Sequence, residues 1–238
     1  MLLNHRDAGM GGIEVGAATT PSVRLRRKID LVVQPYAKSC RTLVTHPRLA
    51  DFWPQFLLTQ HQIIRATVPL TEVAAERAEK MAATDPIASG LVRYLEEHVK
   101  EELGHDDLLL DDLELLGVKR ATALSRIPSP SVASLVGAQY YWIHHHHPVA
   151  FLGFVALMEG HPPTPTLIQT LISATGFPHA AFQTLIDHGE LDPGHRDRLY
   201  RTIDALPLTA EHETVMGISA MHGATLLPST IEEILEQG

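Results

Sequence analysis

Cysteine and aromatic residues are scarce in this chain of 238 residues. Cys40 is the only cysteine, and phenylalanine, tryptophan and tyrosine together make up 5% of the sequence. A lone cysteine excludes an intrachain disulfide framework and fits a reducing compartment, so we expect a cytoplasmic protein. Runs that alternate between β-branched and polar residues are also few, which favours helices over sheet. The expected fold class is therefore all-α.

Several functional signatures are missing as well. The formal net charge is −9 and no long block of lysine and arginine is present, so we expect no nucleic-acid partner. No apolar run reaches the length of a membrane span, and the amino terminus lacks the basic-then-apolar layout of a secretory signal, so no membrane association is expected. Gly-rich nucleotide-binding motifs and the Gly-x-Ser-x-Gly nucleophile elbow are also absent.

Apolar residues recur at helical spacing over most of the chain. Residues 1–20 are rich in glycine, alanine and threonine without this period, and we expect a flexible arm there. No linker divides the rest, so residues 21–238 are expected to form one helical domain. The expected helices cover 22–46 with an interruption near Pro35, 51–68 followed by a stop at Pro69 and a cap at Thr71, and 85–117, which begins at a cap formed by Asp85 or Ser89 and ends at the C-cap Gly117. Residues 131–146 and 148–160 form two helices or one helix broken at Pro148. Further helices are expected at 164–175, 178–188, 192–206 and 209–223, with a short turn at 229–237.

The longest of these patterns, 85–117, contains the pair Glu102 and His105. Its apolar positions, which include Leu103, run at helical spacing. On a continuous helix Glu102 and His105 lie about 60° apart and share one face. Glu-x-x-His pairs of this kind hold iron or manganese in the core of helical bundles. The alternative is an ordinary solvated pair on an acidic helix. His98, four residues before Glu102, either joins this face or lies beside the ligands without binding metal.

A second set of ligand-type residues consists of His188, Asp192 and His195. On a continuous helix these three side chains form one narrow stripe. Pro193 and Gly194 disfavour a helix interior, so Asp192 has a structural alternative as the N-cap of a helix that starts at Pro193. A kinked junction would still leave the two histidines close together.

Glu159 is a lone acid that closes an otherwise apolar helical run. Burial of an unpaired carboxylate is costly, so such a residue either reaches solvent at the helix end near Gly160 or meets a cation. By charge, the carboxylates of Glu102, Glu159 and Asp192 leave both a one-metal and a two-metal state open. The mixture of carboxylates and histidines favours iron or manganese over zinc.

The run His144, His145, His146 and His147 is less specific. Four consecutive helical residues spread over about 300° and cannot all face one ion. We expect one or two of them to point inward and the others to lie on the surface, and we assign none of them to the metal site.

Three segments carry a family resemblance: LEEHVKEELGHDDLLLDDLELLG, FLGFVALMEG and FQTLIDHGELDPGHRDRL. With them the chain resembles, over about 51–205, the heme-oxygenase-like di-iron oxidase and oxygenase superfamily of iron-containing redox enzymes. Its fold is related to that of thiaminase-II and pyrroloquinoline-quinone synthase. The resemblance implies a bundle of about seven helices and a labile pair of iron ions, with manganese as the alternative. The implied ligands are Glu102, His105, Glu159, His188, Asp192 and His195.

The resemblance also implies an activity. Members of this superfamily activate dioxygen for oxidative decarboxylation, C–C cleavage or N-oxygenation. We therefore expect a non-heme iron oxidoreductase that uses dioxygen to oxidise a small amino- or fatty-acid-like substrate, and we expect a homodimer. Two alternatives stay open: a metal-independent bundle enzyme of the thiaminase or quinone-synthase type, and a non-catalytic helical protein whose histidines and acids lie on the surface.

Overall fold

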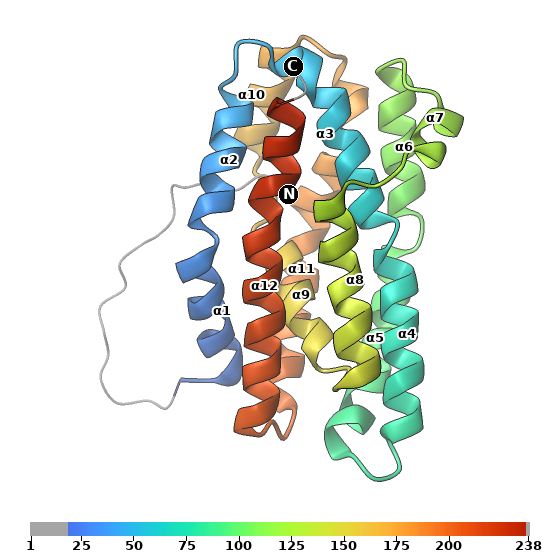
Figure 1. Cartoon of the computed structure of the whole chain (residues 1–238), viewed down its shortest axis with the longest axis vertical. Helices are drawn as coiled ribbons and strands as arrows, with labels where there is room; N and C mark the ends of the chain where they lie inside the picture. Colours follow the sequence, from blue (N-terminus) through green and yellow to red (C-terminus); the bar gives the residue numbers. More distant parts are fainter. Residues whose placement is uncertain (1–18, 237–238) are drawn as a thin grey trace.

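The computed structural model describes residues 19–236, so nearly all of the arm expected at 1–20 lies outside the described residues. Within this range the chain forms twelve α-helices and one short 3₁₀-helix, with no β-strand (Figure 1). The elements are α1 (Pro21–Val32), α2 (Gln34–Val44), α3 (Leu49–Ile64), α4 (Thr67–Met81), α5 (Pro86–Glu102), α6 (His105–Leu115), α7 (Arg120–Ser125), α8 (Pro130–His145), α9 (Ala150–Glu159), α10 (Pro165–Thr175), η1 (His179–Phe182), α11 (Gln183–Ala205) and α12 (Ala210–Leu235).

The long helices lie side by side along the long axis of the molecule (Figure 1). The carboxy-terminal helix α12 packs against α9, α2, α8 and α1, and α4 pairs with α5. Helix α9 buries every residue except Met158, so it is a central helix that must be covered on all sides. The predicted all-α class is confirmed. The structure has more helices than the seven or so expected, because several long helices are interrupted, as at Val33 between α1 and α2.

Helices α9 and α12 pack closely against each other at Gly153. A Cβ atom at this position would lie 2.0 Å from the carbonyl oxygen of Met216. Only glycine fits such a contact between two helix backbones. Gly153 therefore sets how deeply α9, and with it Glu159, lies in the core.

The helix expected over 85–117 is two helices in the structure. Asp85 caps its start, because its side chain accepts hydrogen bonds from the amides of Ile87 and Ala88. The predicted continuity is wrong at Leu103 and Gly104, where Gly104 adopts a left-handed φ of 91°. Leu103, which fits the apolar period, is 71% exposed. A single glycine outweighs the leucine period here because no residue with a Cβ adopts this conformation cheaply.

The opposite correction applies to the helices expected at 178–188 and 192–206. They are replaced by the short η1 and one continuous α11, with Pro193 in its interior. Leu185 before this point and Leu199 and Ile203 after it are buried, and their packing holds the flanking turns in one helix despite the local propensities. Asp192 is therefore not an N-cap.

Two further expectations about helix ends are wrong. The helix expected at 209–223 and the described part of the turn expected at 229–237 belong to one helix, α12, which continues through Pro228 and ends at Leu235. Pro69 and Thr71 do not stop a helix but lie in α4, where Pro69 is in the first turn and needs no amide donor. None of the helices formed by residues 19–236 combines the length and the apolar character that a membrane crossing requires.

Candidate metal centre

Four helices bring the six predicted site residues into one region. Helix α5 ends with Glu102 and α6 begins with His105; α9 ends with Glu159, and α11 carries His188, Asp192 and His195. Their role as metal ligands stays a prediction, but their placement agrees with it: Glu102, Glu159 and Asp192 are all buried. None of these three carboxylates points to solvent, which argues against a purely surface role.

Glu102 lies between two histidines from different helices. Its Oε2 atom is 3.4 Å from Nδ1 of His105, and its Oε1 atom is 3.9 Å from Nδ1 of His195. Burial opposes ionisation of Glu102, but the interactions with His105 and the charge of His98 outweigh it, so the pKa of Glu102 is lowered. Glu102 is therefore ionised, and both of its oxygens face imidazole groups.

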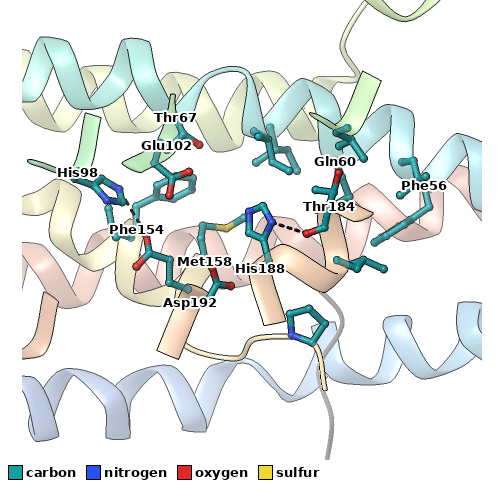
Figure 2. Close-up of a pocket in the computed structure, with 18 of the residues that line it drawn as sticks. Phe56, Gln60, Thr67, His98, Glu102, Phe154, Met158, Thr184, His188 and Asp192 are labelled. Atoms are coloured by element: carbon teal, nitrogen blue, oxygen red, sulfur yellow. Dashed lines mark hydrogen bonds and ion pairs between the residues drawn. The ribbon is translucent and has the colours of Figure 1, made fainter. Parts of the chain in front are cut away.

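His188 is oriented by its own helix. Its Nδ1 atom lies 2.7 Å from the carbonyl oxygen of Thr184, one turn earlier in α11 (Figure 2). Because a carbonyl can only accept, Nδ1 carries the proton, and burial lowers the pKa of His188, which favours the neutral imidazole. Nε2 then keeps its lone pair for a metal ion, the arrangement typical of metal-binding histidines. The ring of His105 lies 4.8 Å from the ring of His188.

The carboxyl groups of Glu159 and Asp192 are poorly stabilised by protein alone. Burial, together with the charges of Glu102 and Asp192, raises the pKa of Glu159 well above its usual range. Burial and the charge of Glu102 raise the pKa of Asp192 to about 7. Oε2 of Glu159 has no hydrogen-bond partner among the described residues. A cation would relieve both the repulsion and the missing hydrogen bond, so the donor set fits a metal.

The structure adds His98, which the predicted ligand set leaves out. This side chain is 1% exposed, and its Nε2 lies 3.5 Å from Oε1 of Glu159 (Figure 2). One donor atom from each of His98, Glu102 and Glu159 lies within 4.8 Å of the other two. The spacing of four residues between His98 and Glu102 is visible in the sequence, but the contact with Glu159 on α9 is not.

A cavity of about 90 Å³ opens beside these residues. His98, Glu102 and Asp192 lie towards one end of the view and Phe56 towards the other, with Met158 and His188 between them (Figure 2). The remaining wall is mainly apolar and includes Leu57, Ile63, Leu109, Phe151, Val155 and Leu185. No lysine or arginine lines this cavity in the part of the chain that the structure describes.

The histidine run lies elsewhere, as expected. His144, His145 and His146 are exposed, and His147 alone is buried. Nε2 of His147 bonds to Oδ2 of Asp85 at 3.0 Å, while its Nδ1 accepts from the amide of Val149. His147 thus supports the start of α5 and takes no part in the site.

Solved structures share this architecture. A protein of unknown function with a heme oxygenase-like fold from Shewanella denitrificans is 14% identical with a TM-score of 0.76, over 90% of this chain and 91% of that chain. A TenA homolog from Pseudomonas syringae is 10% identical with a TM-score of 0.67, over 94% and 99%. Heme oxygenase-1 from Synechocystis, in complex with heme, is 11% identical with a TM-score of 0.67, over 92% and 94%. At these identities the likeness establishes a heme oxygenase-like fold and no activity.

The sequence comparison goes one step further. A family model described as iron-containing redox enzyme matches residues 72–226, well over half of the chain and all of the site residues. The chain therefore belongs to the family of iron-containing redox enzymes, which confirms the resemblance seen in its motifs. No curated protein sequence matches it.

Proposed function

We propose that the protein is an iron-dependent oxidase or oxygenase that uses dioxygen to oxidise a small organic substrate. One observation carries the proposal: residues from four helices form a carboxylate and histidine cluster in which several donor atoms have no hydrogen-bond partner among residues 19–236. Among them are Oε2 of Glu159 and Nδ1 of His195. Protein interiors rarely leave such groups unpaired unless another partner occupies the site. Membership of the family supports iron as that partner.

The six predicted residues would hold two iron ions, with manganese as the alternative metal. They are Glu102, His105, Glu159, His188, Asp192 and His195. Bound iron supplies reversible one-electron chemistry and open coordination positions for dioxygen. Glu102, whose two carboxylate oxygens face His105 and His195, would hold metal together with these two histidines.

The cavity supports a substrate with one polar end and an apolar remainder. Phe154 and Met158 lie next to the carboxylate and histidine cluster, while Phe56 lies at the far end of the cavity. These side chains exclude water and bury hydrocarbon. Because no lysine or arginine among residues 19–236 lines the cavity, the bound metal would supply the positive charge that attracts the carboxylate of an amino- or fatty-acid-like substrate.

The metal-independent alternative has weaker support. No cysteine, serine or lysine lines the cavity within the described residues, so it contains no thiol or amine nucleophile. Cys40, the sole thiol, is buried on α2 and is not part of this wall. Covalent catalysis without a metal would therefore have to depend on carboxylates and histidines that already crowd one another.

Anaerobic titration of the metal-free protein with Fe(II) tests the proposal, followed by exposure to dioxygen. We expect two ions to bind, and we expect dioxygen uptake and a change in absorbance when the loaded protein meets air. His188→Ala should weaken binding by about 100-fold or more, since loss of groups that merely orient ligands already costs about 10–100-fold. His179→Ala, at an exposed position on η1, is the matched control and should bind normally. Absence of Fe(II) binding by the wild-type protein would refute the proposal.

A further inference from the structure

One buried histidine has no role in the six-residue ligand set. We propose that His98 is a direct metal ligand through Nε2, so that the centre uses four histidines and three carboxylates. This inference rests on the proposed function, because it concerns the same metal centre.

The first argument is the geometry of His98 and Glu159. Nε2 of His98 and Oε1 of Glu159 are 3.5 Å apart, yet Nε2 has no hydrogen-bond partner among the described residues. Two donors bound to one divalent ion at about 2.1 Å each lie roughly 3–3.5 Å apart. The pair therefore has the separation of two ligands of a common ion.

The second argument is convergence. His98 and Glu102 are one turn apart on α5 and so project from the same face. Glu159 reaches the same point from α9, and the three donor atoms lie within 4.8 Å of one another. All three residues are buried, so water does not readily replace a missing partner. An ion bound between these side chains would give Nε2 of His98 a partner and would reduce the repulsion between the carboxylates of Glu102 and Glu159.

The third argument is the environment of the other ring nitrogen. Nδ1 of His98 faces Oε2 of Glu101 at 3.9 Å. Glu101 is in turn paired with the guanidinium group of Arg198 on α11. A carboxylate near Nδ1 favours the proton on that nitrogen and leaves Nε2 free to bind metal. Successive contacts thus lead from Arg198 through Glu101 to His98, whose other ring nitrogen faces the proposed ion.

The fourth argument is rigidity. The ring of His98 stacks on the ring of Tyr94, with centroids 5.6 Å apart and planes 13° from parallel. Both side chains are buried on α5. The imidazole is therefore held in the orientation that aims Nε2 at Glu159, before any ion binds.

The test compares His98→Phe and His98→Gln with the wild-type protein. Phenylalanine preserves the ring that stacks on Tyr94, and glutamine preserves polarity. His61→Gln is the matched control, because His61 is fully buried on α3, its ring nitrogens also lack hydrogen bonds within the described residues, and it does not line the cavity. Anaerobic Fe(II) titration against a chromophoric chelator measures stoichiometry and affinity, and circular dichroism checks folding.

Proton NMR of the Co(II)-loaded protein supplies a readout other than activity. Each bound imidazole contributes one strongly shifted, exchangeable N–H signal. We expect four such signals in the wild-type and His61→Gln proteins and three in the His98 variants. We also expect affinity for at least one Fe(II) ion to fall by about 100-fold or more in both His98 variants.

Each outcome has one meaning. Three shifted signals in the wild-type protein would overturn the ligand role even if neither His98 variant folds. A loss of affinity without loss of a shifted signal would make His98 a positioning residue and would also overturn the proposal. If the wild-type protein binds no metal at all, the proposed function fails; if it binds two ions and the His98 variants match it, only this inference fails.

Discussion

Glu102 is the last residue of α5 and His105 is the first residue of α6, and their side chains meet at 3.4 Å across the break between the two helices. The break is made by Leu103 in an extended conformation and by Gly104 with a φ of 91°. The two candidate ligands are therefore positioned by a turn and not by the regular spacing of one helix. Their relative orientation depends on whether this turn is kept.

Gly104→Ala should disturb the candidate metal site although residue 104 contributes no ligand, because Gly104 forms the turn between Glu102 and His105. A Cβ at this φ meets no neighbouring atom but is strained by the backbone, at a cost of about 1–2 kcal/mol. If the strain is relieved by a change in the turn, Glu102 and His105 separate. We expect a free energy of unfolding lower by about 1–2 kcal/mol and Fe(II) affinity reduced by about tenfold or more, measured by urea denaturation and by anaerobic titration.

Gly117→Ala is the control for this effect. Gly117 also has a left-handed φ, 82°, and open space around it, but it follows α6 at the end away from the candidate ligands. Its substitution should cost similar stability and leave Fe(II) affinity unchanged. Equal loss of affinity in both variants would show that the turn at Gly104 has no special role.

The same turn shows what the sequence could and could not predict. The residue types were sufficient to select Glu102 and His105, because a Glu-x-x-His pair is a local signal. The turn was not predicted, since leucines continue at helical spacing on both sides and only the left-handed conformation of Gly104 reveals the interruption. The pair meets in space, but across a turn between two helices and not on the one continuous helix that the leucine spacing predicts.

Long-range contacts account for the rest. Pro193 suggested a helix end near Asp192, but buried leucines on both sides keep α11 continuous, and no local rule reports that packing. His98 was visible one turn before Glu102, yet its contact with Glu159 joins α5 to α9 and depends on how the bundle closes. Most helical segments and the candidate ligands can therefore be predicted from the sequence, whereas the exact helix ends and the assembly of the site depend on conformations and packing that the sequence pattern does not show.

Asp112 links two of the helices that carry candidate ligands. Its carboxylate on α6 accepts hydrogen bonds from the amides of Gln183 and Thr184 at 3.1 and 2.9 Å, at the start of α11. These amides have no partner within their own helix. Asp112→Ala should lower the free energy of unfolding by about 1–3 kcal/mol and weaken Fe(II) binding, because α11 loses its anchor to α6. Urea denaturation and anaerobic titration measure both effects.

Asp111→Ala separates this anchoring from a simple change of charge on α6. Asp111 is the neighbouring, exposed acid, and its partner is Arg120 at the surface. Its loss should change stability by less than about 1 kcal/mol and leave metal binding intact. If Asp112→Ala behaves in the same way, the link between α6 and α11 does not contribute to the site.

Gly153 should be among the positions least tolerant of substitution. An added Cβ would lie 2.0 Å from the Met216 carbonyl, so Gly153→Ala must push α9 away from α12. We expect a loss of about 3 kcal/mol or more in the free energy of unfolding, at the upper end of what overpacking costs. Gly137→Ala in α8 is the matched control: its Cβ meets nothing within 4 Å, and it should stabilise the helix by about 0.5–1 kcal/mol. Thermal unfolding measures the stability of both variants. If both substitutions stabilised the protein, or both destabilised it, the result would contradict this packing argument.

Asp192 should make the metal-free protein less stable as pH rises. Its pKa is raised to about 7 by burial and by the charge of Glu102, against an ordinary value of 3.8. The folded state therefore binds this proton more tightly than the unfolded chain does. The stability linked to the proton is fully present below pH 3.8 and is lost as pH rises towards 7. Between pH 5 and 8 the loss is on the order of 2–3 kcal/mol.

Asp192→Asn isolates this contribution, because the amide does not titrate. In the metal-free state the wild-type protein should lose more stability than the variant between pH 5 and 8, as measured by urea denaturation at each pH. Metal must displace the same proton from Asp192, so the Fe(II) affinity of the wild-type protein should rise with pH and level off above about 7. The variant should bind more weakly throughout and show a shallower pH dependence. If the stabilities of the two proteins changed with pH in parallel, Asp192 would already be ionised in the folded state between pH 5 and 8. A cation would then not be needed to keep Asp192 ionised.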